Sequence, residues 1–302
     1  MRNRLADSLD YVLRNVGDEL AIGADDARDL IARIRSNHQS PHLFGAYYDL
    51  VFALESDDLE SARGFAAELL SRSPLVGTHI SRIDERSRAE EERYRRLFLS
   101  ELHVELPDPE LMADCRRRFD EAFALLDAGF PEMAEEIRAL LREIVVAAGP
   151  EDPKALTFDG ASCYMLWGAI LLNARGQKTV LDTAQALAHE SGHNLLFGFS
   201  VDGPLVENQD DELFSSPLRK DPRPMDGVFH ATYVVARMHQ TLTRLLNSGV
   251  LSADQVTAAE SDLAAHKQNF AIGDAVVREG GRLTEVGRDV IEAAREYMAA
   301  AG

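Results

Sequence analysis

Apolar residues recur at intervals of three and four through the first half of the chain, which predicts a series of amphipathic helices. The clearest case is residues 4–21, where one helical face collects Leu5, Leu9, Val12, Leu13 and Val16. Similar patterns, separated by short polar or Gly/Pro breaks, cover residues 25–36, 42–56 and 58–73, and two more helices are expected over about 110–128 and 131–148. Residues 81–98 mix both signs of charge at short intervals, which is typical of a solvent-exposed helix.

Two stretches favour strands instead. Leu102, Val104 and Leu106 alternate with polar residues ahead of two prolines, which indicates a short strand. Residues 156–176 are rich in aromatic and β-branched side chains, so we expect one or two buried strands there, although a buried helix over 162–173 fits nearly as well. Residues 147–155, with two prolines and a glycine, are typical of a linker.

The second half again predicts helices, here with clear start signals. One helix should cover about 180–198, opened by Thr179 or Asp182, and a long one should begin at Asp226 and reach about residue 247 after an acidic loop (201–225). Two final helices are expected over about 252–279 and 284–300, with Ser252 and Thr284 as N-caps. The fold class is therefore mainly α-helical with a small β element. We expect an N-terminal helical lobe (1–148) and a second lobe (149–302), or one continuous domain.

Composition narrows the possible partners. The 302 residues include 45% apolar residues, enough for a core, and 32 Lys plus Arg against 51 Asp plus Glu give a net charge of −19. Such a surface repels phosphates and anionic lipid headgroups, so we expect neither nucleic acid nor membrane as a partner. The N-terminal segment lacks the apolar core of a signal peptide, and Cys115 and Cys163 have no metal or redox spacing, so a cytoplasmic protein is expected.

The candidate chemistry begins in the helix over 180–198. His189, Glu190 and His193 form H-E-x-x-H, the usual mark of a zinc protease. Residues i and i+4 share one helical face, so both imidazoles can reach one divalent ion, while Glu190 lies about 100° round the helix. The surrounding residues are apolar, and burying two histidines there without a partner would be costly. The motif therefore predicts a metal-binding helix, which should pack against a second helix that carries another ligand.

A catalytic metal usually takes three protein ligands. The metzincin pattern would need a glycine where Leu196 stands and a histidine where Phe199 stands. A thermolysin-like enzyme would take a glutamate about 20 residues further on, but Glu207 and Glu212 lie in a loop-like sequence that lacks the matching motif. His230, placed in the first turn of the helix that Asp226 should cap, is the stronger third candidate.

These motifs together resemble a bacterial family of HExxH-type peptide-modification proteins, which are iron- and 2-oxoglutarate-dependent β-hydroxylases of ribosomal peptides. The resemblance is carried by H-E-S-G-H (189–193), SPLRKDPRPMDGVFH (216–230) and RLTEVGRDVI (282–291), and it covers roughly residues 155–295. It is strongest in R-P-x-x-G-x-x-H (223–230).

The resemblance implies Fe(II) held by His189, His193 and His230, with 2-oxoglutarate and O₂ as cosubstrates and hydroxylation of an amino-acid side chain, in a peptide or a free amino acid. An arginine should bind the distal carboxylate of 2-oxoglutarate, with Arg223 as first choice and Arg219 and Arg237 as alternatives. The alternative function is a Zn(II)-dependent peptidase or other hydrolase, in which Glu190 is the catalytic general base. In an oxygenase, Glu190 would only orient a ligand or a water molecule.

Overall fold

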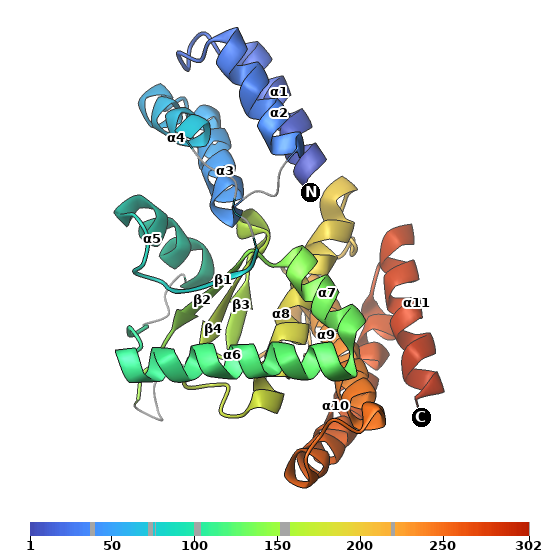
Figure 1. The fold of residues 1–302 in the computed structure, drawn as a ribbon. Helices are drawn as coiled ribbons and strands as arrows, with labels where there is room; N and C mark the ends of the chain where they lie inside the picture. The colour runs from blue at the N-terminus through green and yellow to red at the C-terminus, as the bar shows by residue number, and fades with distance from the viewer. Residues whose placement is uncertain are drawn as a thin grey trace. The chain divides into compact units, whose positions relative to one another are not determined.

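The computed structural model describes residues 1–36, 40–71, 75, 77–99, 104–151, 158–218 and 221–301. These residues form two compact units: unit 1 is Met1–Pro107 with Leu141–Leu172, and unit 2 is Asp108–Leu140 with Asn173–Gly302. The fold class is as predicted, mainly helical with a small sheet (Figure 1). The units divide the chain at points other than the expected boundary at 148/149, because each unit is built from two separate stretches.

The N-terminal part of unit 1 is a group of four helices, α1 (Arg2–Val16), α2 (Ala24–Ser36), α3 (Pro41–Glu55) and α4 (Leu59–Ser71). Their apolar faces meet in one core cluster, in which Leu9, Ile34 and Leu50 are fully buried. The start of α3 shows how local sequence sets an element: Pro41 fits the first helical turn, and Ser40 accepts a hydrogen bond from the backbone N–H of His42. All four predicted helices are present.

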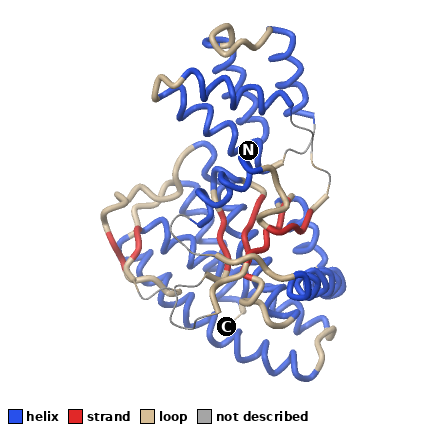
Figure 2. Tube along the Cα trace, turned by 90° about the vertical axis from the view of Figure 1, so that its left-hand side faces the viewer, coloured by secondary structure: helices blue, strands red, loops and turns tan. Residues whose placement is uncertain are grey.

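The rest of unit 1 contains a four-stranded sheet in the order β1 (His79–Arg82), β2 (Glu143–Ala147), β4 (Ala169–Asn173), β3 (Gly160–Ser162). The β1–β2 pair is parallel and the β3–β4 pair is antiparallel. In Figure 2 the strands stand out as short segments in a chain that is otherwise helix and loop. Strands were expected near 160–173, and two lie there, separated by a short 3₁₀ helix, η2 (Tyr164–Leu166).

The predicted helix over 131–148 is wrong beyond Leu140. Helix α7 (Pro131–Leu140) ends there, and the chain continues as β2, whose residues from Ile144 to Ala147 are fully or almost fully buried. Its β-branched side chains pack well in a sheet and lose rotamer freedom in a helix, and here that preference prevails. Of the strand expected around Leu102–Leu106, the first part lies outside the described residues, and Glu105 forms one isolated antiparallel bridge with Ala148.

The predicted solvent-exposed helix over 81–98 is wrong too. Residues 88–94 do form a helix, α5 (Arg88–Tyr94), which continues as a π-helix, η1 (Arg95–Leu99). However, the side chain of Arg93 is only 3% exposed, and Tyr94 is fully buried. Arg93 is paired with Asp49 of α3 and Glu68 of α4. The mixed charges in this segment therefore include residues that connect helices in the interior, which local charge patterning cannot reveal.

Unit 2 consists of α6 (Pro109–Gly129), α7, α8 (Val180–Phe199), α9 (Met225–Ser248), α10 (Ala253–Gly280) and α11 (Glu285–Ala300). The four helices after residue 180 agree with prediction, and Thr179, Ser252 and Thr284 cap the three helices for which they were expected. Between α8 and α9 lie a 3₁₀ turn, η3 (Ser200–Asp202), and a two-stranded ribbon of β5 (Leu213–Phe214) and β6 (Arg223–Pro224).

Helix α9 is central to unit 2, because both α8 and α10 pack along it. Two glycines permit α8 and α10 to approach α9 closely. A Cβ added at Gly273 of α10 would overlap the Oγ1 of Thr232 on α9, and one at Gly192 of α8 would lie 3.1 Å from Cγ1 of Val234 on α9. The prediction that the H-E-x-x-H helix packs against the helix bearing His230 is confirmed. None of the described helices is long and apolar enough to cross a membrane.

Candidate functional site

Helix α8 positions the two motif histidines. Thr179 and Asp182 form a reciprocal capping box that fixes the start of α8, and His189 and His193 follow one turn apart on the same face. Their Nε2 atoms are 3.2 Å apart. Two imidazole nitrogens bound to one tetrahedral ion at about 2.0–2.1 Å would lie about 3.3 Å apart. The pair is therefore spaced as two ligands of one divalent ion would be.

His230 reaches this pair from α9. Its residue is 9% exposed, and its ring stacks on that of His193 with centroids 5.3 Å apart and an interplanar angle of 18°. The Nδ1 atoms of these two rings are 3.1 Å apart. Helix α9 begins at Met225, one residue earlier than expected. Its N-cap is Pro224 rather than Asp226, and no side chain accepts a capping hydrogen bond there. His230 consequently lies in the second turn, with Nε2 3.9 Å from Oδ1 of Asp226.

The three histidines are together, but not in a coordinating arrangement. Within the part of the chain that the structure describes, no group of three or more His, Cys, Asp or Glu side chains is arranged to hold a metal ion. The reason lies in His193, which turns Nε2 toward His189 and Nδ1 toward His230. To share an ion with the other two, His230 would have to turn one of its ring nitrogens toward the position between Nε2 of His189 and Nε2 of His193.

Burial keeps two of the three imidazoles neutral. Burial, together with the nearby His230, lowers the pKa of His193 to about 3, and burial lowers the pKa of His230 to about 4. Both imidazoles are therefore uncharged near pH 7, with one unprotonated nitrogen in each ring. The neutral imidazole is the form that binds a metal ion.

Glu190 lies beside the cluster. Its side chain is 6% exposed, and its Oε1 is 3.9 Å from Nε2 of His189. The side chain of Asn194 donates to the backbone carbonyl of Glu190, one turn along α8. A buried carboxylate thus lies beside the same nitrogen of His189 that faces His193.

The three candidate arginines differ sharply. Arg219 lies outside the described residues. Arg223 is in β6 with 43% of its side chain exposed, and its Nε is 3.1 Å from Oδ2 of Asp221. Arg237, seven residues after His230 on α9, is only 8% exposed. The Nε atoms of Arg223 and Arg237 are both buried without a hydrogen bond, but only that of Arg223 has a carboxylate beside it in an ion pair.

Arg237 passes directly over the motif backbone. A Cβ added at Gly192 would lie 3.5 Å from both Cδ and Nε of Arg237. Tyr233, one turn before Arg237, interacts electrostatically with it, and burial raises the pKa of Tyr233 above its usual value of 10, so the phenol stays protonated. Gly192, one of the two variable positions of the motif, thus leaves room for a buried guanidinium beside the histidine cluster.

Sequence reasoning missed part of this arrangement. Tyr233 and Arg237 follow His230 by three and seven residues, so their position on the same side of α9 was available from the helical repeat. The partners of Arg237 on α7, Met133 and Glu136, lie about 100 residues earlier in the chain, and no local pattern indicates them.

The loop acids behave as expected. Glu212 is bound by Arg282 and accepts from the side chain of Asn208 and the backbone of Gln209. The hydrogen bond from Arg282 is the main reason that the pKa of Glu212 is lowered to about 2. This carboxylate is committed to an exposed ion pair, which supports its interpretation as a loop residue rather than a metal ligand.

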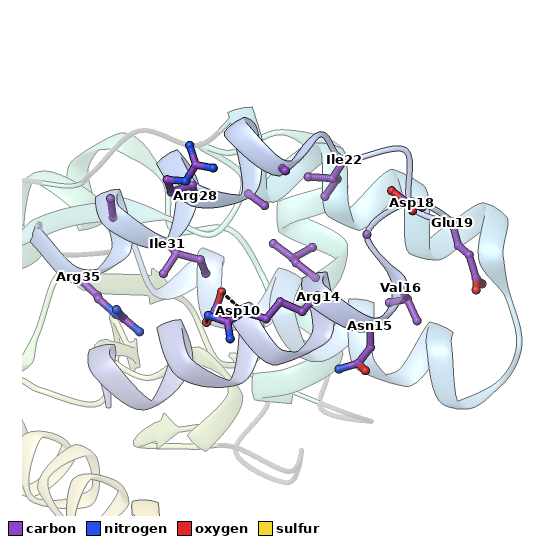
Figure 3. Close-up of a pocket in the computed structure, with 15 residues that line it drawn as sticks. Asp10, Arg14, Asn15, Val16, Asp18, Glu19, Ile22, Arg28, Ile31 and Arg35 are labelled. Atoms are coloured by element: carbon purple, nitrogen blue, oxygen red, sulfur yellow. Dashed lines mark hydrogen bonds and ion pairs between the residues drawn. The ribbon is translucent and has the colours of Figure 1, made fainter.

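A cavity lies elsewhere, in unit 1. It has a volume of about 690 Å³ and is lined by α1, α2 and the turn between them, with Leu13, Ile22 and Ile31 among its residues (Figure 3). The lining residues Arg14 and Asp10 form an ion pair. None of the residues that the sequence singled out for chemistry lines this cavity.

Comparison with known proteins adds no family. No family model matches the chain, and none of the curated proteins matches it significantly. The resemblance to the HExxH-type β-hydroxylases therefore rests on the motif residues alone.

Proposed function

We propose that this protein is an Fe(II)- and 2-oxoglutarate-dependent oxygenase that hydroxylates an unactivated β carbon of an amino-acid side chain, in a peptide or a free amino acid. One observation supports this most: the buried guanidinium of Arg237, with an unsatisfied Nε, lies across the backbone of the H-E-x-x-H motif. Nη2 of Arg237 is paired with Glu136, but a buried donor such as Nε is costly to leave without an acceptor. The distal carboxylate of 2-oxoglutarate would supply that acceptor, whereas metal-assisted peptide hydrolysis requires no fixed cation.

The donor set suits a divalent ion. Three imidazoles, of which His193 and His230 are neutral near pH 7, offer ligands that either Fe(II) or Zn(II) accepts. Because none of the three is charged, the ion would keep its full positive charge for a dianionic cosubstrate, unlike an ion in the common site of two histidines and a carboxylate. His189 and His193 already have ligand spacing, so the change required is in the ring of His230.

Arg237 and Tyr233 would hold the distal carboxylate of 2-oxoglutarate. A guanidinium edge and a protonated phenol are both hydrogen-bond donors, and an arginine can bind a carboxylate through two parallel N–H···O bonds. We rank Arg237 above Arg223, our first choice from the sequence, because Arg223 is largely exposed and lies against Asp221. Arg219 stays an alternative.

The other side chains near the histidines would position the substrates. Oxidative decarboxylation of 2-oxoglutarate at such a site supplies the oxidant for C–H hydroxylation. The side chains of unit 2 would fix the orientation of the keto acid and exclude water, and Glu190 would orient a ligand or a water molecule.

We also propose a cytoplasmic location, since Cys115 and Cys163 are both free thiols, and we propose no nucleic-acid or membrane partner, given the net charge of −19.

The second candidate function is a Zn(II)-dependent hydrolase. It is favoured by one observation, the buried carboxylate of Glu190 at 3.9 Å from Nε2 of His189. In that reaction Glu190 would take the proton of a metal-bound water molecule. The two functions therefore differ in what they require of Glu190 and Arg237.

Turnover of 2-oxoglutarate tests the proposal. The protein is supplied with Fe(II), ascorbate, O₂ and 2-oxoglutarate, and succinate is measured by NMR. We expect slow succinate formation even without the amino-acid substrate, its loss in His193→Ala and Arg237→Met, and its retention in Glu190→Gln. Absence of succinate from the wild-type protein, together with zinc-dependent peptide cleavage that Glu190→Gln abolishes, would establish the hydrolase instead.

A further inference from the structure

The charge of Arg237 is balanced from one side only. Its Nη2 donates to Oε1 of Glu136 and, at 3.1 Å, to the sulfur of Met133, both on α7. A thioether is a weak acceptor, so Glu136 is the principal anion for this guanidinium in the structure. Nε, on the side toward Gly192, has no hydrogen-bond partner at all.

The pairing is also geometrically incomplete. Glu136 meets Nη2 through a single oxygen, whereas an arginine binds a carboxylate best through two parallel N–H···O bonds. A second carboxylate that used Nε and Nη2 together would satisfy the buried Nε. Because the two N–H groups of Nη2 already donate to Glu136 and Met133, such a ligand would also take one of these bonds and bring a second negative charge beside Glu136.

The two partners of the pair differ in exposure. The side chain of Arg237 is 10% exposed and lies in the packed interface of α8 and α9, while that of Glu136 is 36% exposed. Moving Arg237 would disturb the packing against Gly192, but Glu136 can turn toward solvent and be hydrated there. The carboxylate is therefore the partner that can leave.

We propose that Glu136 is a displaceable internal carboxylate: it neutralises Arg237 while the site is empty and gives way when the carboxylate of a keto acid or other dicarboxylate binds to Nε and Nη2. This inference rests on the proposed function, in which Arg237 anchors 2-oxoglutarate. Glu136 then sets the affinity of the site, because each binding event must displace it. Neutralising Glu136 should tighten ligand binding.

The matched variants are Glu136→Gln and Glu135→Gln. They make the same change in charge one residue apart on α7, but Glu135 is exposed, and Arg237 pairs with Glu136 rather than with Glu135. Glu136→Asp serves as a second probe, since it keeps the charge and withdraws the carboxylate by one methylene. Binding of 2-oxoglutarate and of succinate is measured by calorimetry on the full chain, loaded anaerobically with Fe(II) and also without metal.

We expect Glu136→Gln to bind 2-oxoglutarate about tenfold more tightly than the wild type, which corresponds to about 1.4 kcal/mol. Glu136→Asp should shift binding in the same direction by less, and Glu135→Gln should stay within about twofold. If the wild type binds 2-oxoglutarate through Arg237 but Glu136→Gln binds it equally or more weakly, Glu136 orients the arginine and our inference is wrong, while the proposed function stands. If no variant binds either dicarboxylate with or without metal, the proposed function fails and this inference fails with it.

Discussion

The contact between α9 and α10 makes a quantitative prediction about Gly273. In Gly273→Ala the new methyl group would overlap Oγ1 of Thr232 and lie 3.2 Å from its Cβ and 3.0 Å from Cγ of Pro217. Thr232 is fully buried, and its hydroxyl donates to the carbonyl of Val228 at 2.7 Å, so rotating it away breaks that bond.

Opposing effects decide the sign of the change. Alanine is favoured over glycine inside a helix by about 1 kcal/mol. Overpacking a core costs about 1–3 kcal/mol, and loss of a buried hydrogen bond adds about 1 kcal/mol. The cost of the overlap exceeds the gain in helix propensity, so we expect Gly273→Ala to lower the free energy of unfolding by about 1–3 kcal/mol, with Tm lower by several degrees.

Urea unfolding of four proteins measures this: the wild type, Gly273→Ala, Thr232→Ala and the double variant. The double variant should be more stable than the sum of the single changes predicts, by about 1 kcal/mol or more, since Thr232→Ala removes the overlapping oxygen. Gly64→Ala is the control for helix propensity, because an added Cβ at this exposed position of α4 meets nothing within 4 Å. Unchanged or increased stability in Gly273→Ala would refute the close packing of α9 and α10.

Further predictions concern unit 1 and the site. Arg93→Met should cost up to about 3–5 kcal/mol in urea unfolding, because it removes the buried guanidinium between Asp49 and Glu68 and leaves Asp49 with Arg96, which is half exposed, and Glu68 with His42. Loss of the exposed Arg88–Glu92 pair in Arg88→Met should change stability far less, and equal effects would contradict this. Burial opposes the change, but hydrogen bonds from Arg93 and His42 lower the pKa of Glu68. This carboxylate therefore stabilises the fold above its unfolded pKa of about 4.3, and that stabilisation is lost as the pH falls below this value. Glu68→Gln should therefore flatten the acid side of the stability–pH curve, and an unchanged slope would exclude this role. Gly192→Ala adds a methyl group 3.5 Å from Nε of Arg237 and 3.1 Å from Cγ1 of Val234. It should weaken 2-oxoglutarate binding at least several-fold, while the tight contact with Val234 and the helix preference of alanine largely offset each other in the unfolding free energy. Unaltered binding would argue against Arg237 as the anchor.

The sequence was informative where local interactions decide the structure. The starts of α8, α10 and α11 followed from Thr179, Ser252 and Thr284, each of which satisfies backbone donors of its own first turn. The spacing of His189 and His193 likewise follows from the helical repeat alone. Metal coordination remains a prediction, because only the proximity of His230 to this pair is visible.

Sequence reasoning failed where partners are distant in the chain. Arg93 is buried because carboxylates from α3 and α4 surround it, and its own segment gives no sign of them. Arg223 was preferred because it precedes the helix of His230 by a proline-fixed turn, whereas the helix itself brings Arg237 beside Gly192 of the motif. Exposure and tertiary contacts, rather than distance along the chain, separate these two arginines.

The most direct test of the proposed function is anaerobic titration of the Fe(II)-loaded protein with 2-oxoglutarate, followed by visible spectroscopy. Chelation of the metal by the keto acid should produce a weak charge-transfer band that is lost in His230→Ala and requires a much higher concentration of 2-oxoglutarate in Arg237→Met. His239→Ala, which changes a histidine that lies on α9 against Tyr297, should keep the band. A protein that binds Fe(II) through His189 and His193 yet shows no band at any concentration of 2-oxoglutarate would contradict the proposed oxygenase.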